Sequence, residues 1–141
     1  MIFNRKIELV FDQYVKLILD SQSKICNWLY NQLLEKVNEE YKQKQIEAIL
    51  LRGRNLRDVI PQLKKVHPFL KSVYSSPLKN VAFRLNNAFD GFFKCGRGHP
   101  KFRSNKVSWF SVYYDEPYKG YKIKDNSLTL SLGKSWERRT R

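Results

Sequence analysis

The segment 94–106 is the part of the sequence whose side chains are best suited to binding an anion. It combines two glycines and a proline with a run of basic side chains, and it contains no acid. Lysine and arginine neutralise the phosphates of a nucleic-acid backbone and release its counterions. We therefore expect this segment to be a cationic loop that contacts phosphates. Its basic residues are Lys94, Arg97, Lys101, Arg103 and Lys106.

The basic character extends upstream of this loop. Residues 59–89 contain no carboxylate, and extension to residue 106 adds a single acid, Asp90. Residues 1–45, in contrast, alternate acidic and basic side chains, which is typical of a plain solvated surface. Lys79 and Arg84 are either ordinary solvated residues or part of a nucleic-acid surface, and the missing carboxylates favour the second interpretation. The cations of the upstream stretch are Lys64, Lys65, Lys71, Lys79 and Arg84.

The net charge of the whole chain points to a polyanionic partner. It amounts to +14 over 141 residues, and such an excess repels itself in a compact fold unless a polyanion neutralises it. Nucleic acid is the commonest such partner, and an anionic membrane surface is the competing one. No stretch approaches the roughly 20 apolar residues of a membrane span, and the N-terminus lacks the features of a secretory signal. The sequence therefore predicts a cytoplasmic protein without a membrane partner.

Neither the cysteines nor the carboxylates form a pattern that predicts catalysis. Cys26 and Cys95 lie far apart, and no local ligand pair joins them to His67 or His99, so we expect reduced thiols and no metal site. The closest acidic cluster, at residues 115–116, is better explained as part of a turn. Two-metal hydrolysis needs several convergent carboxylates. The sequence thus predicts no catalytic site, no cofactor and no small-molecule substrate.

Helical periodicity fills the first two thirds of the chain. A short piece over residues 14–18 is followed by a long piece over 25–41, whose apolar residues recur on one face. A second helix is predicted to start at Asn55, which is a suitable cap. Pro61 either kinks this helix or marks its real start, and it ends before Pro68 because the residue before a proline avoids the α region.

The third helix is the clearest in the sequence. Ser76 is expected to be its N-cap and Pro77 to occupy its first position, while Gly96 and Gly98 end it. Phe83 lies off the apolar face of this helix, so it either packs against a second element or stacks on a base. The apolar face itself consists of Leu78, Val81, Ala82, Leu85, Ala88, Phe89 and Phe92.

Strand patterns lie on either side of the helical region. Residues 2–11 alternate apolar and polar side chains, and residues 107–114 form an aromatic and β-branched run. Residues 121–132 read as a β-hairpin whose turn is Asp125–Asn126. A lone strand buries little, so we expect the first strand to join the later ones in one sheet.

The sequence therefore predicts an α+β fold with two lobes and a tail. A helical lobe of three to four helices, residues 12–106, is inserted after the first strand of a small antiparallel β lobe, residues 1–11 plus 107–133. The basic loop 94–106 closes the helical lobe. The tail, residues 134–141, has Trp136 as its apolar anchor.

Several motifs occur in the order in which one known family has them. Residues 27–29 read Asn-Trp-Leu, after a Cys where the family usually has Tyr, and residues 63–65 and 69–73 read Leu-Lys-Lys and Phe-Leu-Lys-Ser-Val. The amphipathic third helix follows, and then residues 98–104 read Gly-His-Pro-Lys-Phe-Arg-Ser, similar to the family's Gly-x-Pro-Arg-Phe-Lys-Ser loop. In this order, over residues 7–133, the chain resembles the N-terminal part of the OrfB/TnpB proteins of bacterial insertion sequences. These are transposases related to type V CRISPR effectors.

The resemblance implies RNA-guided DNA recognition. It implies that the strands form an oligonucleotide-binding-like wedge lobe, and that the inserted helices, often called a helix-turn-helix region, form a recognition lobe. Together these lobes would hold the guide RNA and read a short duplex motif beside the target. The family's Mg²⁺-dependent RuvC-like nuclease carries its carboxylates and a cysteine zinc site downstream of the residues present here. The resemblance thus implies a DNA- and guide-RNA-binding segment of a transposable-element protein for DNA recombination. It would have no catalytic site of its own, and the missing nuclease portion would be a further partner.

The resemblance also assigns roles to individual residues. The start of the third helix would approach the duplex, and the basic loop would contact the nucleic-acid backbone. Trp109, on a predicted strand, either packs in the core or stacks on a base. The predicted nucleic-acid-binding residues are Ser75, Ser76, Lys79, Asn80, Arg84, Lys94, Arg97, Lys101, Arg103, Lys106 and Trp109.

Two other functions stay open from the sequence. The chain is alternatively a protein-interaction or scaffold module, in which the charge serves solubility or docks an acidic partner. The other function is that of a self-contained DNA-binding regulator, which would need to dimerise to read a two-fold site.

Overall fold

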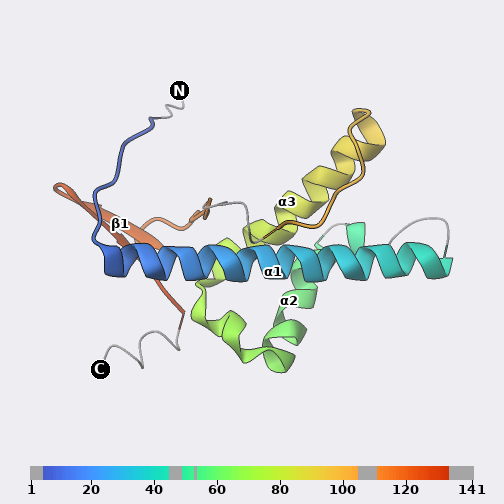
Figure 1. Ribbon diagram of the computed structural model, residues 1–141, viewed down its shortest axis with the longest axis horizontal. Helices are drawn as coiled ribbons and strands as arrows, with labels where there is room; N and C mark the ends of the chain where they lie inside the picture. The colour runs from blue at the N-terminus through green and yellow to red at the C-terminus, as the bar shows by residue number, and fades with distance from the viewer. Residues whose placement is uncertain (1–4, 45–48, 53, 105–110, 134–141) are drawn as a thin grey trace.

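The computed structural model describes residues 5–44, 49–52, 54–104 and 111–133. Within these ranges the chain is α+β, with three α-helices and a two-stranded antiparallel sheet (Figure 1). The elements are α1 (Gln13–Lys44), the 3₁₀ turn η1 (Ile49–Leu51), α2 (Asn55–Val66), the 3₁₀ turn η2 (Pro68–Ser72), α3 (Ser75–Lys94), β1 (Tyr121–Lys124) and β2 (Ser127–Leu130).

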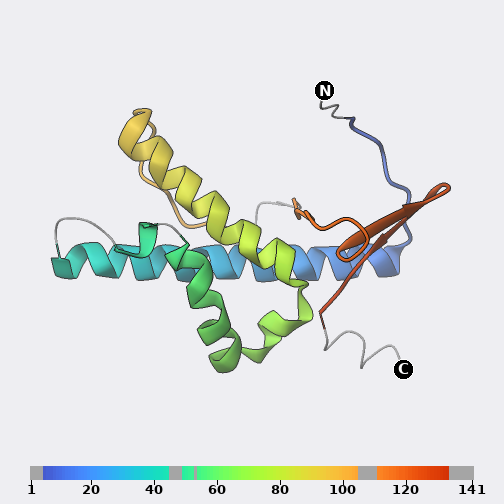
Figure 2. The ribbon, with the colours of Figure 1, turned by 180° about the vertical axis from the view of Figure 1, so that it is seen from behind.

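The long helix α1 runs along the length of the molecule (Figure 1). Its 32 residues run without interruption, so the prediction of two helical pieces is wrong; residues 13–44 contain no glycine or proline that would end the first piece. Helix α3 crosses the middle of α1 and packs on it, and α2 packs on α3 (Figures 1 and 2). The side chains that fill the space between them include Leu29, Leu33 and Val37 of α1, all fully buried. The first turns of α1 extend beyond this core, because Tyr14 and Leu17 are exposed.

Helix α2 ends where it was predicted to end, and its proline lies inside it. Asn55 is the first residue of the helix and Arg54 occupies the cap position, with no side-chain cap hydrogen bond, so Asn55 is not the cap. Pro61 neither ends nor begins the helix, which continues to Val66. The helix stops before His67–Pro68, as the sequence predicted. Leu56, Ile60 and Leu63 are its buried residues.

Helix α3 begins at Ser75, two residues earlier than predicted. Tyr74 occupies the N-cap position and makes no side-chain cap hydrogen bond, so the prediction that Ser76 caps the helix is wrong. Ser76 is instead 2% exposed and inside the first turn. Pro77 is tolerated there because the N–H groups of a first turn have no partner within the helix. The end of α3 is confirmed at Lys94, and Gly96 adopts a positive φ of 68° just after it.

The predicted hairpin is confirmed, and the strand predicted before α1 is not. Tyr121 pairs with Leu130 and Lys124 with Ser127, and Asp125 in the turn has a φ of 52°. Residues 5–11, the described part of the first predicted strand, and residues 111–114 of the aromatic run belong to no strand. The N-terminal segment nevertheless lies at the same end of α1 as the hairpin (Figures 1 and 2). Side chains of both parts line one groove, and within the described residues no backbone ladder joins them. Residues 1–4, 107–110 and the predicted tail lie outside the described residues.

Polar contacts attach the hairpin to the helical part. The Gly133 N–H donates a hydrogen bond to the Ser72 carbonyl over 3.0 Å, and the Gln22 side-chain amide donates to the same oxygen over 3.0 Å. The Tyr74 hydroxyl donates to the Glu116 carboxylate over 2.9 Å. The strand pair is therefore held against η2 and the start of α3, which supplies the support that an isolated hairpin lacks.

None of the described helices is both long enough and apolar enough to cross a membrane.

Candidate nucleic-acid interface

A groove with a basic rim lies between the start of α2 and the outer face of α3. Its volume is about 540 Å³, which is within the range of small-molecule sites. Segment 111–116 supplies its third wall. We call this the basic groove. Its lining residues are Arg54, Arg57, Lys79, Asn80, Ala82, Phe83, Asn86, Tyr113 and Asp115.

The helical period explains why the polar residues of α3 face this groove. Lys79 and Phe83 are four residues apart and therefore lie on one face, and both are exposed. Leu78, Val81 and Leu85 point the other way and are buried in the core. Because the apolar face of α3 packs in the core, the opposite face presents polar side chains and one phenylalanine to the groove: Lys79, Asn80, Phe83 and Asn86.

Further cations gather beside the groove. Burial lowers the pKa of the Lys64 ammonium, and the positive charges of Lys79 and Lys71 lower it further. These lysines come from α2, η2 and α3, so three elements bring like charges into one neighbourhood. Like charges held together at a folded surface attract a counterion. Lys64 and Lys71 were absent from the predicted site, although the carboxylate-free stretch contained both.

One acid lines the basic groove, and another pairs with one of the arginines of the groove. The Asp58 carboxylate is 3.4 Å from the Arg57 guanidinium, and both side chains are exposed. An exposed pair of this kind contributes about 0–1 kcal/mol and exchanges readily with other charges, so Arg57 stays accessible to a phosphate. Asp115 is the second acid and lines the groove.

The basic loop after α3 is packed against the helices. Figures 1 and 2 show it running back beside α3 towards α1. The Asn31 side chain of α1 binds the main chain of Arg103 twice, accepting from its N–H over 2.8 Å and donating to its carbonyl over 2.9 Å. The His99 ring meets the rings of Phe89 and Phe92 edge-on, with centroids 5.4 and 5.2 Å apart. The loop therefore has a defined path.

Two predicted phosphate ligands are used for packing. The Arg103 guanidinium carbon lies 3.9 Å from the centre of the Tyr30 ring. Arg84 donates to the carbonyl and the hydroxyl of Ser111 over 3.4 and 3.0 Å. Burial is the main cause that lowers the pKa of both guanidinium groups. Both arginines therefore tie the segments that follow α3 to the helices, and they present less of their charge to solvent than the exposed cations do.

The other predicted residues fall into separate places. Lys79 and Asn80 lie in the basic groove together with Arg54 and Arg57, which the prediction missed. Ser75 is half-buried and Ser76 is buried. Lys94, Arg97 and Lys101 are exposed at the far end of α3 and on its loop. Lys106 and Trp109 lie outside the described residues. Arg54 and Arg57 precede the carboxylate-free stretch, and no local sequence signal marked them.

Replacing Asn31 by alanine is expected to release the basic loop. The change removes both hydrogen bonds to Arg103 and costs about 1–3 kcal/mol of loop stability. Amide hydrogen exchange at Arg103 should accelerate accordingly. Asn31→Asp keeps the acceptor for the Arg103 N–H and loses the donor, so its exchange should be intermediate. Equal exchange in the wild type and the alanine variant would show that the loop is held elsewhere.

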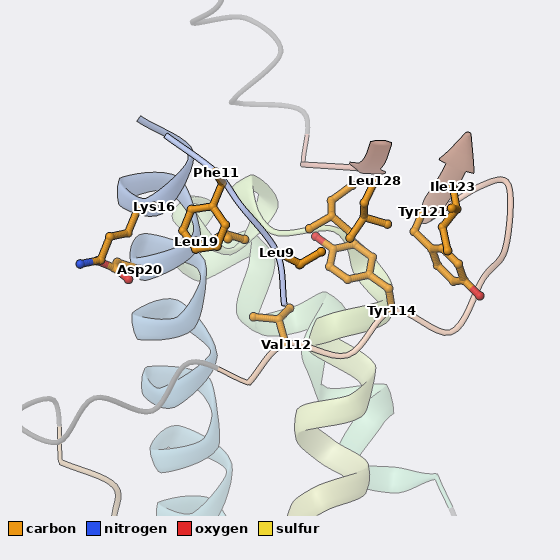
Figure 3. A pocket seen from close by; sticks show the side chains of 11 residues that line it. Leu9, Phe11, Lys16, Leu19, Asp20, Val112, Tyr114, Tyr121, Ile123 and Leu128 are labelled. Carbon is orange, nitrogen blue, oxygen red and sulfur yellow. The ribbon is translucent and has the colours of Figure 1, made fainter. Parts of the chain in front are cut away.

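A second groove, of about 510 Å³, is mostly apolar. In Figure 3, Leu9 and Phe11 of the N-terminal segment, Leu19 of α1, and Tyr114 and Leu128 from the C-terminal part converge on it. Lys16 and Asp20 lie at the α1 side of the same groove (Figure 3). We call this the apolar groove. The sequence did not single it out, because its walls come from both ends of the chain.

The thiols and acids of the described residues do not gather into a metal site. Cys26 and Cys95 are both free thiols, one buried and one exposed. Burial raises the pKa of the Cys26 thiol to about 11, although the charges of Arg84 and Arg103 act in the opposite direction. Throughout the described ranges, no three histidine, cysteine or acidic side chains come close enough to hold a metal ion.

Comparisons of the chain with protein-family models, with curated proteins and with solved structures find no match. The residues and their arrangement are therefore the basis for a functional proposal.

Proposed function

We propose that this chain is a nucleic-acid-binding module, and specifically the DNA- and guide-RNA-binding segment of an OrfB/TnpB-like transposase or RNA-guided endonuclease. The observation that carries the general proposal is the convergence of Arg54, Arg57 and Lys79 on one groove, with Lys64 and Lys71 close to Lys79. Cations held together in this way by separate elements can neutralise neighbouring phosphates of a nucleic-acid backbone. The more specific proposal depends on the ordered motifs of the sequence.

The lobes of the proposed protein follow from the same resemblance. The helical part would be the recognition lobe. Residues 5–11 and 111–133 would form the wedge lobe of oligonucleotide-binding type, with the apolar groove at its centre. In this proposal the chain is cytoplasmic and catalyses nothing by itself. The strand cleavage would belong to a nuclease portion elsewhere in the protein.

The salt dependence of binding tests the general proposal. If about six phosphates are contacted, log K should fall against log [salt] with a slope of about −5 on duplex DNA, because each contact releases about 0.9 counterion. Fluorescence anisotropy of labelled DNA duplexes and RNA strands, measured from 50 to 300 mM salt, provides the slope. Weak association that does not change with salt would rule out a backbone-binding function.

A protein-interaction or scaffold module is the second candidate, and the apolar groove favours it. Ile123 and Leu128 of the hairpin are exposed beside this groove, and exposed apolar patches often mark contacts between proteins. Under this proposal a protein partner occupies the apolar groove. Its pull-down with the purified chain should survive nuclease treatment and be lost in Ile123→Lys. A complex lost on nuclease treatment would be held by nucleic acid instead.

A further inference from the structure

The basic groove holds features that a purely phosphate-binding surface does not need. Phe83 of α3 and Tyr113 of segment 111–116 both line it, with 60% and 51% of their surface exposed. Exposed aromatic rings beside cations are the usual means by which proteins stack unpaired bases. The faces of a base in a duplex are covered by its neighbours, so rings of this kind act on single strands. The aromatic content of the groove therefore points to an unpaired nucleobase.

The acceptors of the groove indicate which edge of the base faces them. The Asn86 side-chain oxygen is buried and accepts no hydrogen bond from any described residue. Asp115 adds a carboxylate to the same lining. A carboxylate repels a phosphate but accepts a hydrogen bond from a base amino group. Both acceptors thus favour a base that carries an exocyclic amino group, as cytosine, adenine and guanine do.

The cations of the groove account for the phosphates that flank a bound base. Arg54, Arg57 and Lys79 line the same groove and can neutralise the phosphates on either side of the bound base. We propose that the basic groove binds one unpaired, amino-bearing nucleobase of a single strand. In this arrangement Phe83 and Tyr113 stack on its ring, and Asp115 accepts a hydrogen bond from its amino group. The Asn86 side chain turns its buried oxygen, which has no partner among the described residues, towards the same group. This inference rests on the proposed nucleic-acid-binding function and adds the structural state and the base class of the ligand.

Strands that differ in one base test the inference at constant charge. The probes are short DNA strands of abasic units that carry a central cytosine, a central uracil or no base. Uracil has a carbonyl oxygen where cytosine has its C4 amino group, and its N3 carries a proton. The cytosine strand should bind about tenfold more tightly than the base-free strand, because stacking on aromatic rings contributes about 5- to 150-fold per base. The uracil strand should lie between them.

Two variants and a matched control connect this gain to the groove. Phe83→Leu and Tyr113→Leu should each remove most of the difference between the cytosine and base-free strands. Phe102→Leu is the control, because Phe102 is 59% exposed but lines a hollow that contains Glu35 and Glu39. It should keep the full difference. Circular dichroism of each variant checks that the helices are intact.

The outcomes separate the two proposals. If all three strands bind equally and with a steep salt dependence, the base site is wrong and the nucleic-acid-binding function stands. Equal binding of cytosine and uracil overturns the recognition of the amino group. If no strand and no duplex binds at low salt, the proposed function itself is wrong.

Discussion

Replacing Arg57 and Lys79 together by glutamate is expected to weaken nucleic-acid binding roughly 60-fold in 0.1 M salt. Each phosphate contact contributes about eightfold at this concentration through counterion release, and the two side chains line the same groove. The slope of log K against log [salt] should become shallower by about 2. The fold should tolerate the change, since Lys79 is exposed and Arg57 lies in the first turn of α2, where an acid is favourable. Fluorescence anisotropy over a salt series measures both quantities.

A second double variant separates the groove from the total charge. Lys119→Glu with Lys122→Glu changes the net charge by the same amount on exposed residues at the hairpin. Charges that are farther than about 8–10 Å from the ligand are largely screened, so this variant should lose little affinity and keep the original slope. An equal loss in the two variants would mean that binding follows the total charge and that the groove is not the site.

Replacing Gly133 by alanine is expected to have the largest effect on stability. A methyl group at this position would overlap the Lys71 carbonyl oxygen and lie 2.5 Å from the Ser72 carbonyl carbon. Both are main-chain atoms of η2, so no side chain can rotate away. The chain must move back, which also breaks the Gly133 N–H hydrogen bond to the Ser72 carbonyl. We expect a loss of about 3 kcal/mol in the free energy of unfolding, measured by urea denaturation with circular dichroism.

The hairpin should respond more than the helical core. Amide exchange of residues 121–130 should accelerate in Gly133→Ala. The buried part of α1 should exchange faster only by the amount that the lower free energy of global unfolding accounts for. Gly98→Ala is the matched control, because a methyl group there meets no atom within 4 Å and the φ of Gly98 is not in the left-handed region. Its stability should stay the same or rise slightly. Similar stability of the two variants would show that the hairpin is not held through Gly133.

The sequence alone determined the elements whose stability is local. The hairpin around Asp125 was predictable because the turn chemistry and the alternation lie within ten residues. The end of α3 before Gly96 and the end of α2 before Pro68 follow from main-chain constraints of single residues. The helical period also placed Phe83 off the apolar face of α3, away from the core.

Only the tertiary structure decided which residues share a site. Arg54, Arg57 and Tyr113 meet Lys79 because α2 packs on α3 and segment 111–116 lies beside both, and no local pattern encodes these contacts. Arg103 looked like a phosphate ligand, but Asn31 and Tyr30, more than seventy positions earlier, fix its main chain and cover its side chain. The alternation before α1 did not give a strand, because a strand needs a partner backbone and the described residues offer side chains instead. Periodicity reports which face of an element is buried, whereas the composition of a binding site depends on which elements that burial brings together.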